Sequence, residues 1–281
     1  MQVGIGLPNT INGISPDALL DWMRQAEAGP FSSLAVLDRV EYDSYDPLTT
    51  LAAAAAITER IRLASMVIIG PLRNTAILAK TAASIDALSK GRLTLGIAIG
   101  ARKSDYDITN SRYNNRGDRL SQQLSSLRDH WENEAIGPRP FSPTGPELLV
   151  GGISDITFER VSRYADGFMH NGGSPRYFSR QADKARAAWL DAGRPGSPKL
   201  WGMGYFALGD DEVTQGGADY LREYYAFTGP FAEKITEDLL TTPQAITQFV
   251  RGYAEAGCNE LVLYPTTNHP DQLQRLADIV G

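Results

Sequence analysis

Short apolar runs alternate with longer mixed stretches along the whole chain. Each run is apolar at consecutive positions, which is typical of parallel strands that are buried on both faces. Glycine, proline and asparagine stand close to the ends of several runs and indicate where the strands stop. We therefore expect strands at 3–7, 33–37, 61–69, 93–99, 148–150, 167–170, 200–208 and 260–264.

The stretches between these runs carry signals for the start and the end of helices. Ser15, Pro16 and Asp17 combine an N-cap, a proline at the first helical position and an acid in the first turn, and Gly29 follows as a stop. The polar segment 102–115 is expected to be a long loop. Helices are expected at 16–28, 47–56, 75–89, 119–131, 157–165, 175–192, 219–226, 231–239, 243–255 and 269–280.

This alternation predicts an α/β fold with a parallel sheet, either a closed barrel or an open doubly wound sheet. A count of eight strands, and a length of 281 residues, favour the closed (β/α)8 TIM barrel, which typically needs about 250 residues. The Pro- and Gly-rich segment 137–146 resembles a linker, but neither half of the chain would hold a complete sheet. We therefore expect one domain over 1–281.

Composition narrows the possible functions. The net charge is −6 and no basic stripe stands out, which argues against a nucleic-acid partner. One cysteine, Cys258, cannot form an internal disulfide or a thiolate-rich zinc site, and the three histidines lack carboxylate partners at ligand spacing. The first residues show no secretion signal, and no apolar run is long enough to span a bilayer. We expect a cytoplasmic protein with no metal site and no membrane partner.

In a TIM barrel the active groups come from the loops that follow the strands. Two such loops, after the fifth and sixth strands, contain paired glycines and lead into helices, so their backbone N–H groups could bind one phosphate together. The alternative is that these glycines only make tight turns. The candidate phosphate-binding residues are Gly151, Gly152, Ile153, Ser154, Asn171 and Gly172.

Charged side chains end two further strands. Asp38 and Arg39 follow the second strand, where Arg39 would lie beside an anionic or carbonyl group of a ligand, or the two would pair with each other and fix the loop. His170 ends the sixth strand and is an acid–base candidate, although a lone histidine is more often structural. Aromatic residues gather in 220–231, which could cap a substrate pocket together with the loop 102–115, or belong to the core.

The stretch 46–106 closely resembles the luciferase-like monooxygenase superfamily, which includes bacterial luciferases and oxidoreductases that use the deazaflavin coenzyme F420. The resemblance is recognisable from about residue 3 to 170 and is fainter beyond, and its motifs are specific for the superfamily but not for one reaction. The matching pieces are 58–63 (TERIRL), 71–73 (PLR), 79–80 (AK), 88–93 (LSKGRL), 95–96 (LG), 149–154 (LVGGIS), 165–167 (ADG) and 256–261 (AGCNEL).

The resemblance implies a (β/α)8 barrel that holds FMN or F420 at the carboxyl ends of the strands, with the phosphate near 151–154. It also implies a cis peptide in the third strand beneath the flavin ring, here between Met66 and Val67. Gly100 lies in the loop after the fourth strand and is assigned to the cofactor site. Bacterial luciferases bind the FMN phosphate through an arginine near position 99, which is isoleucine here, and Arg102 is the candidate substitute.

Two departures limit which reaction is implied. Many relatives carry histidine where this chain has Arg39, and arginine cannot act as a general base at neutral pH. F420-dependent sugar-phosphate dehydrogenases carry glutamate where this chain has Ala101, which makes that chemistry improbable here.

The sequence therefore predicts a monooxygenase that uses reduced FMN and oxygen on a small organic substrate. In this site, Arg39 and Asp38 would be catalytic and His170 a weaker acid–base candidate. One alternative is an F420-dependent reductase that transfers hydride to an imine, alkene or carbonyl, and another is a flavin-binding protein without catalysis. Either enzyme needs a reductase or dehydrogenase that supplies the reduced cofactor. A homodimer through the helices after the second and third strands is also possible.

Overall fold

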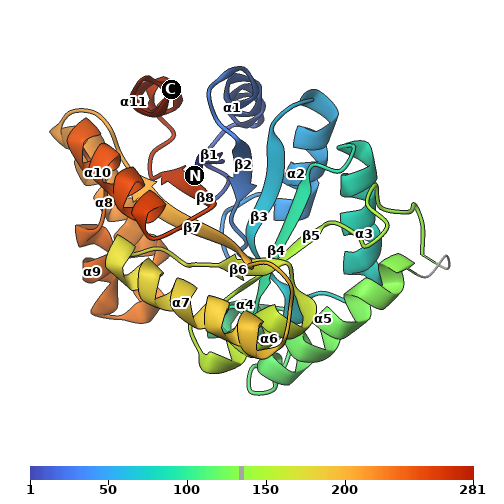
Figure 1. Cartoon of the computed structure of the whole chain (residues 1–281). Coiled ribbons are helices and arrows are strands. Elements are labelled where there is room, and N and C mark those ends of the chain that lie inside the picture. Colours follow the sequence, from blue (N-terminus) through green and yellow to red (C-terminus); the bar gives the residue numbers. More distant parts are fainter. Residues whose placement is uncertain (133–135) are drawn as a thin grey trace.

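The computed structural model describes residues 1–132 and 136–281 and shows a closed barrel of parallel strands in chain order (Figure 1). Pairing of β1 with β8, from Gln2 opposite Glu260 to Ile5 opposite Leu263, closes the ring. The predicted TIM barrel is confirmed, and the open sheet is excluded. The strands are β1 (Gln2–Gly6), β2 (Ser33–Val36), β3 (Arg62–Ile69), β4 (Leu93–Ala98), β5 (Glu147–Gly151), β6 (Gly167–Met169), β7 (Lys199–Phe206) and β8 (Glu260–Pro265).

Helices surround this barrel, and short polar caps fix where several of them begin. The side chains of Ser15, Asp46, Asn74 and Ser174 each accept a hydrogen bond from a backbone N–H in the first turn of the helix that follows. The α-helices are α1 (Pro16–Ala28), α2 (Pro47–Ile57), α3 (Thr75–Leu88), α4 (Lys103–Ile108), α5 (Arg116–Glu132), α6 (Asp155–Tyr164), α7 (Pro175–Asp191), α8 (Asp211–Tyr224), α9 (Phe231–Glu237), α10 (Pro243–Glu255) and α11 (Asp271–Val280), and the 3₁₀ turns are η1 (Gly70–Leu72) and η2 (Ala226–Thr228).

Two segments differ from the prediction. The expected loop 102–115 contains α4, in which the buried Asp105 is fixed by backbone N–H groups from the loop after β2. Helix α8 begins at Asp211 rather than near 219, because Asp210 caps it and two acids occupy its first turn. Gly216 and Gly217 lie inside this helix, and glycine is a weak helix former, which hid the helix from the sequence pattern.

The core has two layers. One layer lies between the barrel and its helices and includes Leu34, Leu63 and Phe168. The other fills the inside of the barrel, where Ala35, Ala64, Leu149, Met169, Trp201, Met203 and Val262 pack together. Because side chains alternate between the two faces of a strand, the position of each residue along its strand decides which layer it joins.

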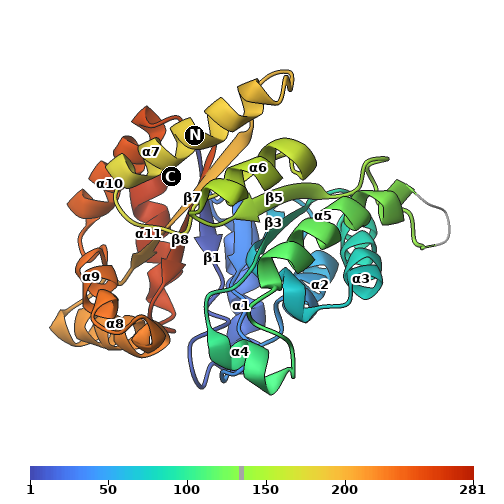
Figure 2. The same cartoon turned by 90° about the horizontal axis from the view of Figure 1, so that it is seen from below.

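The two ends of the barrel have different roles. Figure 2 shows α4, α8 and α9 at the end where the strands finish, away from the N-terminus of β1. At the opposite end, Glu260 is buried and accepts hydrogen bonds from the hydroxyls of Ser32 and Ser33, each at 2.5 Å. We call the end with α4 and α8 the mouth of the barrel, where active groups of this fold are found.

No helix in the described part of the chain combines the length and the apolar character that a membrane span requires.

Candidate functional site

Glycines shape the backbone at the ends of β5 and β6. Gly152 has φ +143°, and a Cβ on it would lie 2.5 Å from Thr157 Oγ1. Gly172 and Gly173 have φ +97° and +100°, which side chains rarely adopt, although neither would place a Cβ closer than 3.5 Å to a neighbour. We call the segments 151–154 and 171–174 the glycine cradle. The positive φ angles of Gly152, Gly172 and Gly173 favour glycine at these positions, whether or not a phosphate binds there.

The first turn of α6 lacks the side-chain cap that most of the other long helices have. Ser154 occupies the N-cap position, but its hydroxyl contacts Thr157 Oγ1 at 3.2 Å instead of a backbone N–H. Asp155 follows, and it forms an ion pair with Lys184 at 2.9 Å. Ile153 is 54% exposed and Asn171 is also exposed. The cradle therefore offers uncapped N–H groups to an anion.

The bond between Met66 and Val67 is cis, at the position that the resemblance implied. The register of β3 against β4 shifts between Ser65 and Ile68, around this bond. Val67 is only partly buried, and a Cβ placed on Gly151 would lie 3.1 Å from Val67 Cγ1. The irregular part of β3 and the cradle are therefore neighbours, and glycine at 151 is what allows their approach.

Asp38 pairs with Arg73, not with Arg39, its neighbour in sequence. Arg73 donates to both carboxylate oxygens, at 2.6 and 3.2 Å, and the Ile69 N–H donates at 2.8 Å. Although burial opposes it, the Asp38 carboxylate raises the pKa of the Arg73 guanidinium above its ordinary value. The pair ties the end of β2 to the end of β3. Asp38 therefore holds the backbone near the cis bond and has its oxygens already engaged.

Arg39 and Arg102 meet at one tyrosine. Their guanidinium carbons lie 5.3 and 4.3 Å from the centre of the Tyr224 ring, and Arg102 donates to the Tyr224 carbonyl at 3.0 Å. Arg39 also lies 4.3 Å from the ring of Tyr42 and donates to the Glu41 carbonyl. Burial, and then the charge of Arg102, lower the pKa of Arg39, but a guanidinium still stays protonated at neutral pH.

A group of tyrosines at the end of α8 closes the mouth above the interior side chains. We call Tyr220, Tyr224 and Tyr225 the tyrosine cap. The Tyr220 hydroxyl bonds to Thr10 Oγ1 and that of Tyr225 to the hydroxyl of Tyr205, both at 2.7 Å. Burial raises the pKa of all three phenols, so they are neutral at physiological pH.

One interior phenol is left without a hydrogen bond. Tyr264, near the end of β8, is 1% exposed, and its hydroxyl has no partner among the described residues. Its ring belongs to the same interior cluster as Tyr205 and Tyr224. The mouth is thus aromatic and dry, with neutral hydroxyls inside and two guanidinium groups at its rim.

His170 does not join this group. It follows Met169, which faces the inside of the barrel, and its ring packs instead at 5.0 and 5.5 Å from Tyr177 and Phe178 of α7. Burial lowers the pKa of His170 to about 4, and neither ring nitrogen has a partner among the described residues. This packing favours a structural role over the acid–base role that the sequence suggested.

The remaining candidate lies between the strand ends. Gly100 follows β4 with φ +70°, and a Cβ there would lie 2.6 Å from Ile69 Cγ2. The sequence candidates therefore form two groups, one at the cradle and one around Arg39 and Arg102. Sequence reasoning did not identify Arg73 or the role of Tyr224, whose partners are far apart along the chain.

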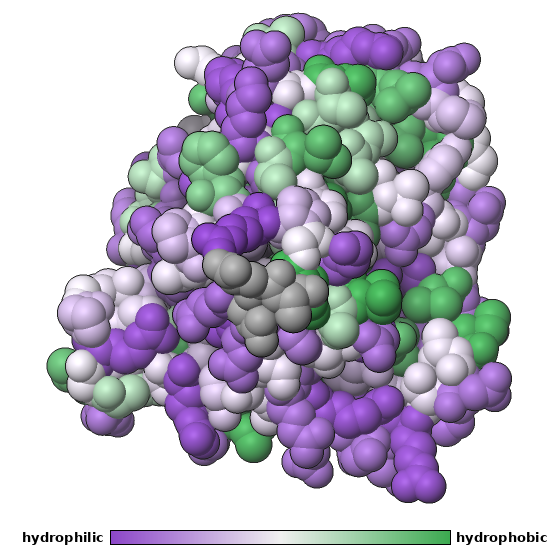
Figure 3. All heavy atoms as spheres, turned by 90° about the vertical axis from the view of Figure 1, so that its right-hand side faces the viewer, coloured by the Kyte–Doolittle hydropathy of each residue, from purple (hydrophilic) through white to green (hydrophobic). Residues whose placement is uncertain are grey.

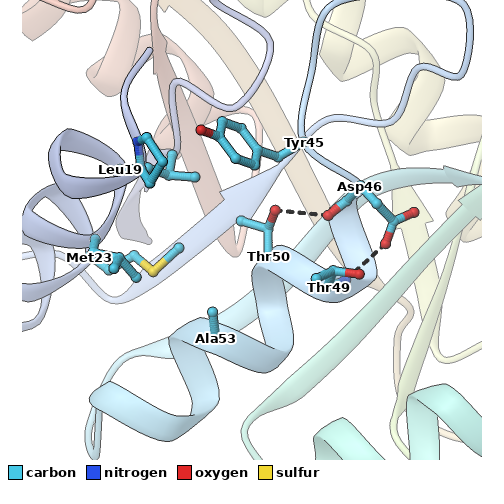
Figure 4. A pocket seen from close by; sticks show the side chains of 9 residues that line it. Leu19, Met23, Tyr45, Asp46, Thr49, Thr50 and Ala53 are labelled. Carbon is cyan, nitrogen blue, oxygen red and sulfur yellow. Dashed lines mark hydrogen bonds between the residues drawn. The ribbon is translucent and has the colours of Figure 1, made fainter.

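The structure has two further hollows, one of which adjoins the mouth at Arg73. An apolar groove of about 230 Å³ lies between α1 and α2, with Leu19, Met23 and Ala53 on its walls (Figure 4). A polar hollow of about 370 Å³ lies beside Arg73 and Arg119.

The surface of the side formed by α2, α3 and α5 is mixed in character. Figure 3 shows hydrophobic residues gathered in its upper part among hydrophilic ones. Ile77 and Leu88 of α3 are each 64% exposed. The homodimer expected through α2 and α3 stays a prediction.

The sequence profile of the luciferase-like monooxygenase family matches residues 1–257. The chain belongs to this family. The matched residues span most of the barrel and contain the cradle and the segment with the cis bond between Met66 and Val67.

Curated relatives share 24–30% of their aligned residues with the chain. An uncharacterised protein of Mycobacterium tuberculosis is 28% identical over 207 residues, which cover 61% of this chain and 71% of that protein. A pyrimidine monooxygenase of Methylobacterium radiotolerans is 30% identical over 174 residues, 53% of this chain and 44% of that protein. An FMNH2-dependent dimethylsulfone monooxygenase of Pseudomonas putida is 24% identical over 162 residues, 52% and 44% of the two chains.

Solved structures share the fold at lower identity. A monooxygenase of Streptomyces bottropensis superposes with a TM-score of 0.81 at 18% identity, covering 99% of this chain and 97% of that one. An F420-dependent secondary alcohol dehydrogenase, in complex with an F420–acetone adduct, superposes with 0.82 at 17% identity, covering 99% and 98%. At this identity the likeness shows the luciferase-like barrel, which FMN and F420 enzymes share.

Proposed function

We propose that this protein is a monooxygenase that uses reduced FMN and oxygen to oxygenate a small organic substrate at the mouth of the barrel. The observation that carries the proposal is the buried, aromatic mouth beneath the tyrosine cap, in which the described phenols are neutral and the ring of His170 packs against α7 instead. Oxygenation by a reduced flavin needs protection from water and electrostatic positioning more than it needs a general base. The two monooxygenases among the curated relatives agree with this reaction class.

The cradle fits a phosphate-bearing flavin. Gly152 and Gly172 hold backbone conformations that expose N–H groups, and the uncapped start of α6 adds a partial positive charge. Gly151 brings the cradle against Val67, so a phosphate bound there would place the attached ring system over the irregular part of β3. When bound, reduced flavin supplies the two electrons that activate oxygen.

The residues of this chain would act by binding and exclusion. The pair of Asp38 and Arg73 would hold the β3 segment in place, and the cradle would bind the phosphate. The tyrosine cap would exclude water, which strengthens every electrostatic interaction in the mouth. Arg39 would orient an oxygen that carries negative charge, and Arg102 would assist as the second cation of the rim.

The second candidate is an F420-dependent reductase that transfers hydride to an imine, alkene or carbonyl. The same cradle suits its phosphate, and the fold likeness to an F420-dependent alcohol dehydrogenase supports it. A third candidate, a flavin-binding protein without catalysis, keeps the cradle but needs no turnover. The two enzyme candidates need a separate reductase or dehydrogenase to supply the cofactor, and we propose that all three work in the cytoplasm.

The test is an anaerobic titration of the protein with reduced FMN and with reduced F420, followed by oxygen and a panel of small substrates. Binding of reduced FMN with substrate-dependent oxygen uptake is the expected result. Binding of F420 without oxygen uptake would replace the monooxygenase with the reductase, and binding without turnover under either donor would leave the non-catalytic protein. Arg39→Ala should lose turnover with the fold intact, while Arg24→Ala, at an exposed pair on α1, should not.

A further inference from the structure

Two positive side chains at the rim of the mouth have no counter-ion. Within residues 1–132 and 136–281, neither Arg39 nor Arg102 has a carboxylate oxygen within 4.0 Å. The Nε atom of each is buried and has no hydrogen-bond partner in the described chain. Arg39 donates there to the backbone carbonyl of Glu41, and Arg102 donates to that of Tyr224 and also interacts with the Tyr224 side chain.

The nearest acids also have other partners. Asp105 is fully buried, and its Oδ1 accepts the N–H groups of Val40 and Glu41, at 3.0 and 2.9 Å, while its Oδ2 has no hydrogen-bond partner in the described chain. The charge of Asp105 only partly offsets the lowering of the Arg39 pKa by burial and by Arg102. Glu223 is exposed and accepts from Asn12 Nδ2 and from the Tyr42 hydroxyl, at 3.2 and 3.3 Å. The two guanidinium groups therefore repel each other across Tyr224, and one negative charge nearby cannot neutralise both.

Other arginines of the protein differ in how they are neutralised. Arg73, Arg128 and Arg186 each form an ion pair with an aspartate at 2.6–2.9 Å, whereas Arg116 and Arg119, like Arg39 and Arg102, have a buried Nε atom without a hydrogen-bond partner in the described chain. Two partly buried cations without partners cost free energy, which stacking on aromatic rings offsets only in part. An anion that bridges both guanidinium groups would remove the repulsion and satisfy the free Nε donors.

The surroundings also indicate the shape of such an anion. Arg102 lies 4.4 Å from the ring of Phe227, which is 46% exposed, and Arg39 lies over the half-buried ring of Tyr42. Each guanidinium group therefore has a partly exposed aromatic ring beside it, in addition to the buried ring of Tyr224. A flat ring that bears a carboxylate could stack on these partly exposed rings while its oxygens reach both arginines.

We propose that Arg39 and Arg102 bind the carboxylate of an aromatic substrate. The inference rests on the proposed function only in that the ligand is a substrate, because binding of a carboxylate by the two arginines requires no cofactor. Arg39 follows β2 and Arg102 follows β4, whereas the cradle follows β5 and β6, and no contact joins the two groups in the described structure. The phosphate of the cofactor and the carboxylate of the substrate thus have separate binding sites.

The test compares benzoate with benzamide, which has the same shape but no charge. Dissociation constants are measured by ligand-observed NMR titration of the full chain, without cofactor and again with reduced FMN or F420 under anaerobic conditions. We expect benzoate to bind at least about tenfold more tightly, which corresponds to about 1.4 kcal/mol, since hydrogen bonds between two charged groups are stronger than those to a neutral amide. Arg39→Gln and Arg102→Gln should each remove this preference.

Arg251→Gln is the matched control, because Arg251 is 73% exposed on α10 and its acid partner lies 3.7 Å away. It should keep the preference for benzoate. Arg39→Lys and Arg102→Lys retain the charge and serve if a glutamine variant fails to fold, and they should keep part of the preference. Circular dichroism verifies the fold of every variant.

Equal binding of benzoate and benzamide to the native protein, or a preference that survives in both glutamine variants, would overturn the proposal. A benzoate preference without any cofactor binding would keep the arginine site and refute the proposed function. Cofactor binding without a benzoate preference would refute the arginine site and leave the proposed function intact.

Discussion

Removal of Arg73 tests the most buried ion pair of the mouth. The Asp38 side chain is 1% exposed and that of Arg73 18%, with bonds at 2.6 and 3.2 Å. Arg73→Ala would leave the carboxylate with one remaining donor, the Ile69 N–H, so we expect a loss of about 3–5 kcal/mol in the free energy of unfolding. The lost bond to Asp46, which is 50% exposed, should add at most about 1 kcal/mol.

Urea unfolding followed by circular dichroism measures this loss as a lower midpoint with an unchanged slope. Arg24→Ala is the control, because its ion pair with Asp21 has side chains that are 56% and 63% exposed. The control should lose no more than about 1 kcal/mol. An Arg73→Ala variant that is no less stable than this control would refute the reasoning.

The same variant has a predicted pH signature. Burial already raises the pKa of Asp38 in the native protein, against the opposing effect of Arg73, so loss of the guanidinium should raise this folded-state pKa further above the unfolded value of about 3.9. A group with a raised folded pKa stabilises the protein below its unfolded pKa, and this contribution is lost as the pH rises. The deficit of Arg73→Ala should therefore be larger at about pH 7 than at about pH 4.5, and a deficit that does not change with pH would contradict a buried, unpaired carboxylate.

Three further predictions concern single side chains. Tyr264→Phe removes a hydroxyl without a partner and should leave the urea midpoint unchanged or raised, whereas Tyr205→Phe breaks a 2.7 Å bond and should cost about 1 kcal/mol. Burial lowers the pKa of His170 to about 4, so its neutral form stabilises the fold above about pH 6.5, and this contribution is lost as the pH falls toward 4. In His170→Phe the free energy of unfolding should therefore fall less steeply between these pH values. An unchanged pH dependence of the free energy of unfolding would contradict the lowered pKa. Gly152→Ala should weaken cofactor binding in the anaerobic titration, because Gly152 has φ +143°, which alanine rarely adopts. Gly216→Ala, inside α8 with open space around it, should bind the cofactor normally and gain up to about 1 kcal/mol in the free energy of unfolding. Equal cofactor binding by both variants would refute the cradle as the phosphate site.

The barrel was readable from the sequence because its signals are local. A proline or polar cap at Ser15, Asp46 and Asn74 marks the start of a helix within a few residues, and the structure places the caps there. The sequence predicts the start of α8 too late, near 219, because Gly216 and Gly217 lower the local helix propensity. In the structure, contacts of Leu221 and other buried residues with the rest of the barrel stabilise the helix, and these contacts are not visible in the local sequence.

The site was readable only in part. Paired glycines near the ends of β5 and β6 predict the cradle, since few other residues tolerate the positive φ angles found there. The partner of Asp38 lies 35 positions away, and the contact between Arg102 and Tyr224 spans 122 positions, so no local pattern contains them. The packing of His170 against α7 was not predictable, because the end of a strand is visible in sequence, whereas the direction of the side chain that follows a three-residue strand depends on the register of that strand.

The closure of the ring also has a consequence for synthesis of the protein. The outer edge of β1 finds its partner only in β8, with Gln2 opposite Glu260. At about 5–20 residues per second, a ribosome needs about 13–50 s between these two residues, and during this time the growing sheet keeps an open edge. An unpaired edge of apolar strands is a template for pairing with other chains. We therefore expect the edge of β1 to be exposed to pairing with other chains until β8 emerges, unless the helices of the barrel cover it.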